Sequence, residues 1–230
     1  MHTLIHYRLC SASRAIRIVL AELGIETELV EEKPWEWRPD FLALNPSGEL
    51  PVLQFDTGVL ICGAYPISEF LAEEFPEHPM DGRGVPLFPG NSEERAEVRR
   101  LVDWFYRKLE REVVRDLLYE KHYGRASGQT PGPDLTVLRA VRANLRYHLR
   151  YIGFLSDHRR WLAGDEMSFA DIAAAAHLSS LDYFGEVPWE DHLMAKAWYA
   201  RIKSRPSFRA LLADRVPGLV PPPHYEDLDF

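Results

Sequence analysis

The stretch from Asp40 to Leu53 reads Asp-Phe-Leu-Ala-Leu-Asn-Pro-Ser-Gly-Glu-Leu-Pro-Val-Leu. Its centre predicts a turn at residues 45–48, because proline fixes φ and glycine accepts a φ that other residues resist. The apolar run that starts at Leu50 predicts a strand, although Pro51 cannot donate a hydrogen bond to a sheet ladder. A cis peptide bond before Pro51 explains this position, because it turns the Leu50 backbone outward to pair with an extended ligand. The alternative is a tight turn that enters a buried strand.

The composition indicates a soluble cytoplasmic protein. The 230 residues are enough for one large domain or two small ones, and the 46% of hydrophobic residues supply a sizeable core. The net charge of −8 argues against a nucleic-acid partner. The chain has no apolar run of about 18 residues and no signal-peptide pattern, so we expect no membrane insertion. Cys10 and Cys62 make no disulfide framework, and the histidines lack metal-ligand spacing, so we expect no metal site.

The first third of the chain has the periodicity of a small α/β domain. Its strands and helices are expected, in chain order, at residues 3–9, 11–23, 26–31, 52–55, 59–62 and 67–75. Gly24 ends the first helix, and an aromatic loop over residues 33–39 follows the second strand. The order strand, helix, strand, loop, two strands and helix is the thioredoxin-like arrangement.

The remainder of the chain predicts helices. Residues 76–90 are rich in proline and glycine and indicate a linker. Long helices are expected at 91–123 and 134–154, and Ser168 with Asp171 resembles a capping box that opens a very apolar helix. We therefore divide the chain into a thioredoxin-like domain at 1–77, a linker at 78–90, an all-helical domain at 91–212 and a C-terminal tail at 213–230.

These features resemble the glutathione-transferase superfamily over residues 1–212. The stretch from Asp40 to Leu53 matches the signature in which a cis-proline precedes the third strand, and residues 198–208 match the final helix with its Arg-Pro-x-Phe exit. The resemblance implies an α/β plus all-α protein with the glutathione-transferase fold, which has a thioredoxin-like N-terminal domain and a helical C-terminal domain. It also implies that Leu50 and Pro51 are candidate contacts for glutathione.

The resemblance places the family's catalytic thiol or hydroxyl at the start of the first helix, where Cys10 and Ser11 stand. Omega-like members carry a cysteine at this place. A helix N-terminus stabilises a thiolate, and we expect Arg14 or Arg17 to help. Cys10 is then a candidate to form a mixed disulfide with glutathione. The alternative is that Cys10 is a small buried apolar residue.

The side chains with which the family binds the γ-glutamyl end of glutathione are missing. Members of the family hold this end with an acidic residue or glutamine followed by a serine, at the turn into the third helix. Gly63 and Ala64 occupy that pair, and neither side chain forms hydrogen bonds. Hydrogen bonds to charged groups contribute roughly 1.5–3 kcal/mol each, so the loss of two predicts much weaker binding. We therefore expect no cofactor, and glutathione only if the protein is an enzyme.

Two aromatic segments are candidate partner-binding sites. Trp35 and Trp37 lie in the proline-bracketed loop, where they form either a lid on the sheet or a contact for a partner, since tryptophan is enriched at interface hot spots. The prolines at 221–223 favour a stiff extended tail. The end of the tail combines acidic and apolar side chains: Tyr225, Glu226, Asp227, Leu228, Asp229 and Phe230. We expect this end to dock on a partner or on its own chain.

A closer resemblance rests on residues 1–15, residues 30–41, the side-chain-poor stretch 62–65 and the acidic tail. They resemble one branch of the superfamily, the transferase-like division proteins of alphaproteobacteria. The resemblance implies a homodimeric pseudoenzyme that binds and organises FtsZ filaments at the division site. The alternative is a cytosolic glutathione transferase, or a glutathione-dependent thiol oxidoreductase, that uses Cys10. Gly63 and Ala64 favour the first hypothesis, whereas Cys10 favours the second.

Overall fold

The sheet follows from the alternation of apolar residues in its strands. The computed structural model describes residues 1–76, 80 and 85–228. Four strands, β1 (His2–His6), β2 (Thr27–Glu31), β3 (Val52–Gln54) and β4 (Leu60–Cys62), lie in the order β2-β1-β3-β4. β1 pairs parallel with β2 and antiparallel with β3, so that Leu4 lies opposite both Leu29 and Leu53. Leu4 and Leu53 are fully buried, because they belong to the central strands of the sheet.

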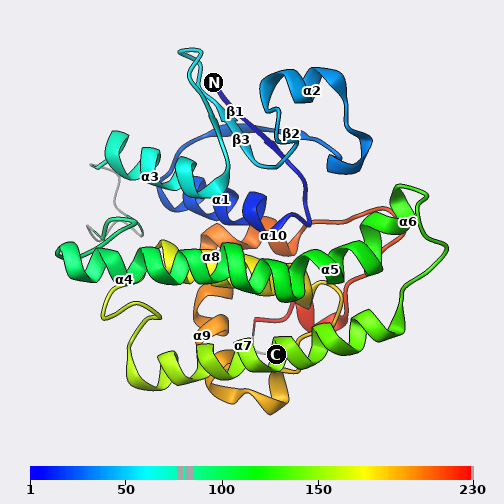
Figure 1. Cartoon of the computed structure of the whole chain (residues 1–230). Helices are drawn as coiled ribbons and strands as arrows, with labels where there is room; N and C mark the ends of the chain where they lie inside the picture. Colours follow the sequence, from blue (N-terminus) through cyan, green and yellow to red (C-terminus); the bar gives the residue numbers. More distant parts are fainter. Residues whose placement is uncertain (77–79, 81–84, 229–230) are drawn as a thin grey trace.

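Three helices complete this part of the molecule. α1 (Ser11–Glu22) and α3 (Ala64–Glu74) pack together below the sheet in Figure 1, and α2 (Pro39–Leu44) lies above it. The Leu50–Pro51 peptide bond is cis, as predicted. The sequence pattern does not predict α2 or the 3-10 turn η1 (Pro34–Glu36), because elements this short contain too few turns to show a periodicity.

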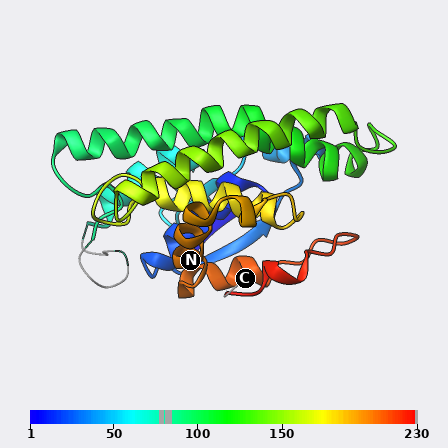
Figure 2. The ribbon, with the colours of Figure 1, turned by 90° about the horizontal axis from the view of Figure 1, so that it is seen from below.

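A helical rod begins at the capping box of Asn91 and Glu94 and runs to Ala126. Its winding changes along its length, from α4 (Ser92–Asp103) to the π-helical η2 (Trp104–Val114), α5 (Arg115–Leu118), the π-helical η3 (Tyr119–Tyr123) and α6 (Gly124–Ala126). α7 (Leu135–His158) lies alongside this rod in both views (Figures 1 and 2). Both predicted long helices are therefore present, but the sequence does not predict the π-helical winding.

α8 (Phe169–Asp182) is the buried centre of the molecule. All of its residues are buried, and its alanines allow close packing against α1 and α4. The predicted capping box is confirmed, since the Asp171 carboxylate accepts hydrogen bonds from the Ser168 N–H at 3.0 Å and from the Trp198 indole at 2.9 Å. The chain is completed by η4 (Trp189–Asp191), α9 (Leu193–Lys203), η5 (Pro206–Phe208), α10 (Arg209–Leu212) and η6 (Pro223–Tyr225).

The predicted linker at 78–90 lies partly outside the described residues. At its described end, Leu87 and Phe88 are buried in the core, so this end packs with the domain instead of lying in solvent. In the described part of the chain, no helix has the length and apolar character needed to cross a membrane.

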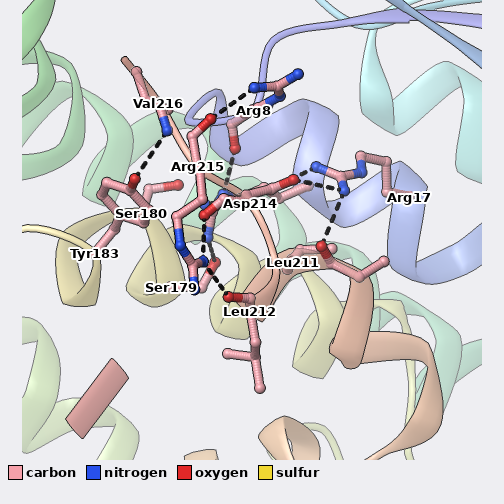
Figure 3. Close-up of polar contacts among 12 residues, drawn as sticks. Arg8, Arg17, Ser179, Ser180, Tyr183, Leu211, Leu212, Asp214, Arg215 and Val216 are labelled. Carbon is pink, nitrogen blue, oxygen red and sulfur yellow. Dashed lines mark hydrogen bonds and ion pairs between the residues drawn. The ribbon is translucent and has the colours of Figure 1, made fainter. Parts of the chain in front are cut away.

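Two buried arginines on α1 connect this helix to the C-terminal segment, residues 213–228. The Arg17 guanidinium donates hydrogen bonds of 2.7 and 3.0 Å to the Asp214 carboxylate, and Arg14 lies 3.7 Å from the same carboxylate. Arg14 also donates to the Ser179 hydroxyl at 3.0 Å and to the Tyr225 hydroxyl at 2.9 Å. Figure 3 shows the contacts of Arg17 and its neighbours around Asp214. Because an unpaired buried charge is costly, α1 and the C-terminal segment hold each other in place.

We expect Asp214→Ala to lower the free energy of unfolding by about 3–5 kcal/mol, because it leaves buried guanidinium groups without their carboxylate. Urea unfolding followed by circular dichroism measures the loss. The control is Asp56→Ala, which removes an exposed ion pair with the amino group of Met1 and should cost about 1 kcal/mol or less. Equal losses in the two variants would contradict the role assigned to Asp214.

Candidate functional site

A cleft of about 370 Å³ lies where the N-terminal part of the molecule meets the helical rod. One wall comes from the start of α1, Pro34 and the loop before Pro51, and the other from side chains of η2, α5 and η3. Three candidates from the sequence, Cys10, Ser11 and Leu50, line this cleft together. This arrangement makes the cleft the candidate functional site.

Cys10 is the N-cap residue of α1, and its Sγ lies 3.8 Å from the Leu50 carbonyl oxygen. Burial raises the pKa of the Cys10 thiol, and the Glu110 carboxylate raises it further. Neither Arg14 nor Arg17 offsets this effect, because both guanidinium groups are bound around Asp214. Burial and the Glu110 carboxylate therefore favour the protonated thiol of Cys10 over the expected thiolate.

The hydroxyl groups near the start of α1 are engaged inside the protein. The Ser11 hydroxyl donates to the Ser180 hydroxyl of α8 at 3.2 Å. The Tyr7 hydroxyl lies 2.5 Å from Nε2 of His122, and burial raises the pKa of this tyrosine. Both hydroxyls therefore link the N-terminal part to the helical part.

The start of α3 brings no side chain to grip a γ-glutamyl group. Gly63 is the N-cap residue with a φ of 89°, a conformation in which a side chain would be strained, and Ala64 is buried. The Gly63 N–H donates to the Pro51 carbonyl at 2.9 Å, and the Ser68 hydroxyl donates to the Tyr65 carbonyl at 2.8 Å. Gly63 and Ala64 therefore supply no side-chain hydrogen bond to a ligand.

The two loop tryptophans have different surroundings. The Trp35 ring is partly buried and packs against Tyr7, which follows β1, and Tyr123 of η3, with ring centroids 5.0 and 5.2 Å away. It therefore packs between the N-terminal part and the helical rod. Trp37 is 61% exposed, and a Cβ added to Gly48 would lie 2.9 Å from its ring. Trp37 therefore lies on the rim of the cleft with a free face toward solvent.

The tail folds back on its own chain through Tyr225. This side chain is fully buried, accepts the hydrogen bond from Arg14, and donates to the Leu211 carbonyl at 3.0 Å. The ring of Tyr225 packs edge-on against Tyr183 at 5.2 Å. Of the two predicted alternatives, docking on a partner or on its own chain, Tyr225 follows the second, because its contacts are made within the chain. It is therefore not a partner-binding residue.

Residues 226–228, which follow Tyr225, are exposed. Glu226 forms an ion pair with Arg215. Burial lowers the pKa of Lys203 to about 8, and the Asp182 and Asp227 carboxylates act against this shift. Leu228 is 37% exposed. Asp229 and Phe230 lie outside the described residues, so the described end of the tail is an acidic surface held in place by Tyr225.

The helical rod contributes cleft residues that the sequence analysis does not identify. Tyr106 and Glu110 lie on η2, and Tyr123 lies on η3. The Tyr106 hydroxyl is buried and has no hydrogen-bond partner within the described ranges, and burial raises the pKa of both tyrosines. The sequence pattern that could identify these residues is their recurrence every four or five positions. This spacing places the side chains on one face only when the helix is π-wound.

Family models match both parts of the chain. The N-terminal domain of glutathione S-transferase matches residues 9–74, and the C-terminal domain matches residues 116–206. FtsZ-localized protein A of Caulobacter vibrioides is 48% identical over 99% of this chain and 98% of its own length. Glutathione S-transferase 2 of Saccharomyces cerevisiae is 28% identical over 87% of this chain and 84% of its own length.

Solved structures give the same result. A glutathione S-transferase from Rhodospirillum rubrum F11 superposes with a TM-score of 0.94 at 50% identity and covers both chains completely. The structure of FzlA from C. crescentus superposes with a TM-score of 0.93 at 47% identity, over 100% of this chain and 99% of its own. The predicted fold is confirmed, and this chain belongs to the glutathione S-transferase family.

Proposed function

We propose that this chain is a binding protein on the transferase fold that binds and organises FtsZ filaments in bacterial cell division. The observation that carries the proposal is the 48% identity, over 99% of the chain, to a protein whose name places it with FtsZ. The protein acts as a homodimer at the division site in the cytoplasm. It requires no glutathione cofactor.

The state of the cleft supports a role without glutathione chemistry. A thiol enzyme needs a thiolate, and burial together with Glu110 raises the pKa of Cys10. A transferase also needs side chains that bind its cofactor, and Gly63 and Ala64 offer no side-chain donor or acceptor at the start of α3. Both observations favour a binding protein over an enzyme.

The tail supports a role in binding because its acids are presented at a fixed place. Tyr225 is locked between Arg14 and Leu211, and Glu226 and Asp227 follow it directly on the surface. A preorganised surface loses less conformational entropy on docking than a flexible tail does. Charges at such a surface set the orientation of a partner and its association rate. Trp37, exposed at the rim of the cleft, is a second candidate contact.

A glutathione transferase or glutathione-dependent thiol oxidoreductase is the second candidate. It is favoured by the cis Leu50–Pro51 bond, by the cleft next to Cys10, and by the glutathione S-transferase from R. rubrum at 50% identity. Binding of glutathione separates this candidate from the first.

We expect Asp227→Lys to lower co-sedimentation with polymerised FtsZ roughly tenfold, because it reverses a charge on the exposed tail. Binding of the unaltered protein should also weaken with added salt, through screening. The matched control is Glu26→Lys, which makes the same change of net charge in an exposed loop. A sample without FtsZ corrects for protein that sediments alone.

Equal binding by the Asp227 variant and the unaltered protein would contradict the role of the tail, and no binding by either would contradict the proposed function. Removal of residues 224–230 is not a clean test, because it also deletes the buried Tyr225. The substitution keeps that anchor in place.

We expect calorimetry to give a glutathione dissociation constant weaker than about 1 mM, because two charge-assisted hydrogen bonds of the family are missing. Ala64→Ser restores one hydroxyl without a change at Gly63 and should strengthen binding only slightly. A micromolar constant for the unaltered protein would instead support the transferase alternative.

A further inference from the structure

The helical rod presents one row of side chains to the cleft. Tyr106, Glu110, Arg115, Tyr119 and Tyr123 all line it, at intervals of four, five, four and four residues. An α-helix has about 3.6 residues in each turn, so this row would wind around it. The π-helical stretches η2 and η3 hold more residues in each turn and keep the row on one face. Such winding is rare and frequently occurs at functional sites.

Glu110 is the central charge of this row. Among the described residues it pairs with no lysine or arginine, and its ion-pair contact is to Nε2 of His177 at 3.5 Å. Arg115 donates instead to Asp116 at 3.0 Å. Glu49 adds a second carboxylate from the opposite wall of the cleft. The cleft lining therefore carries two carboxylates and one guanidinium group, and the guanidinium is paired with Asp116.

His177 does not neutralise Glu110 while its ring is neutral. Its Nδ1 lies 2.6 Å from the Ala173 carbonyl oxygen, which only accepts hydrogen bonds, so Nδ1 carries the ring proton. Nε2 is then a bare acceptor that faces the carboxylate, and it has no hydrogen-bond partner in the described structure. A cation in the cleft therefore offers Glu110 a favourable partner.

We propose that the cleft binds a small organic cation, an aromatic or alkyl ammonium compound, through Glu110 and the neighbouring tyrosines. The carboxylate accepts a charge-assisted hydrogen bond from the ammonium group. Tyr106, Tyr119 and Tyr123 line the same cleft, and an aromatic ring attracts a cation that lies over its face.

The remaining lining sets the size and charge of the ligand. The lining is largely apolar, and a volume of about 370 Å³ suits one aromatic ring system with a short side chain. Cys10 contributes an uncharged thiol. Because Glu110 and Glu49 repel carboxylates, the site selects against anions. The proposal does not depend on FtsZ binding, since it concerns the cleft and not the tail.

A series of three indoles of similar shape tests the selection by charge. Tryptamine carries an ammonium group, tryptophol a neutral hydroxyl, and indole-3-propionate a carboxylate. We expect calorimetry at pH 7 and low salt to show tryptamine binding at least about tenfold more tightly than tryptophol, and indole-3-propionate binding most weakly. Equal binding of the first two compounds, or binding of none, would overturn the proposal.

Two variants test whether Glu110 is the selecting residue. Glu110→Gln keeps the shape of the side chain and removes its charge, so the preference for tryptamine over tryptophol should disappear. The matched control is Asp103→Asn, which removes an exposed carboxylate on the same helical rod that pairs with Arg107, outside the cleft. A preference that survives in the Glu110 variant would assign the selection elsewhere and overturn the proposal, and circular dichroism verifies that both variants are folded.

Discussion

The burial of two guanidinium groups on α1 constrains the rest of the structure. Arg14 is fully enclosed and takes its partners from the chain before α1, from α8 and from the C-terminal segment: the Arg8 carbonyl at 2.6 Å, the Ser179 hydroxyl and the Tyr225 hydroxyl. Arg17 takes both oxygens of Asp214. Since a buried charge is tolerated only when it is paired, α1 packs correctly only when these distant segments are in place. The folded-back tail is thus part of the core and not an appendage.

The same constraint decides the chemistry of the cleft. The guanidinium groups that a thiolate at Cys10 would need lie around Asp214, and the Glu110 carboxylate on the opposite wall raises the pKa of the Cys10 thiol. The protein retains the family's cis Leu50–Pro51 bond and a cleft of about 370 Å³. The charge inside that cleft favours cations over anionic peptides, while the described end of the tail offers a separate acidic surface. The two proposals therefore concern two distinct surfaces of one fold.

Local patterns predict the features that depend on local chemistry. The four strands and the capping box at Ser168 and Asp171 follow from alternation and capping rules, and the structure confirms them. The cis-proline, also confirmed, is implied by the resemblance of residues 40–53 to the family signature. The destinations of Arg14 and Arg17 do not follow, because Asp214 lies about 200 residues away and pairing at that distance leaves no periodic trace. The winding of η2 also escapes prediction, because π- and α-helical segments share the same amphipathic composition. For that reason, the sequence pattern does not identify Glu110 and Tyr106 as cleft residues.

The pH dependence of Cys10 alkylation tests most directly whether the buried arginines have removed thiol chemistry from the cleft. In a Cys62→Ser background, iodoacetamide reports on Cys10 alone, since the chain has two cysteines. Because the thiol pKa is raised, the thiolate forms only above the range of an ordinary cysteine, about 8.5. We expect the alkylation rate to stay low through neutral pH and to rise only above that value. A rate that reaches its plateau below pH ~7 would show a stabilised thiolate and contradict this account.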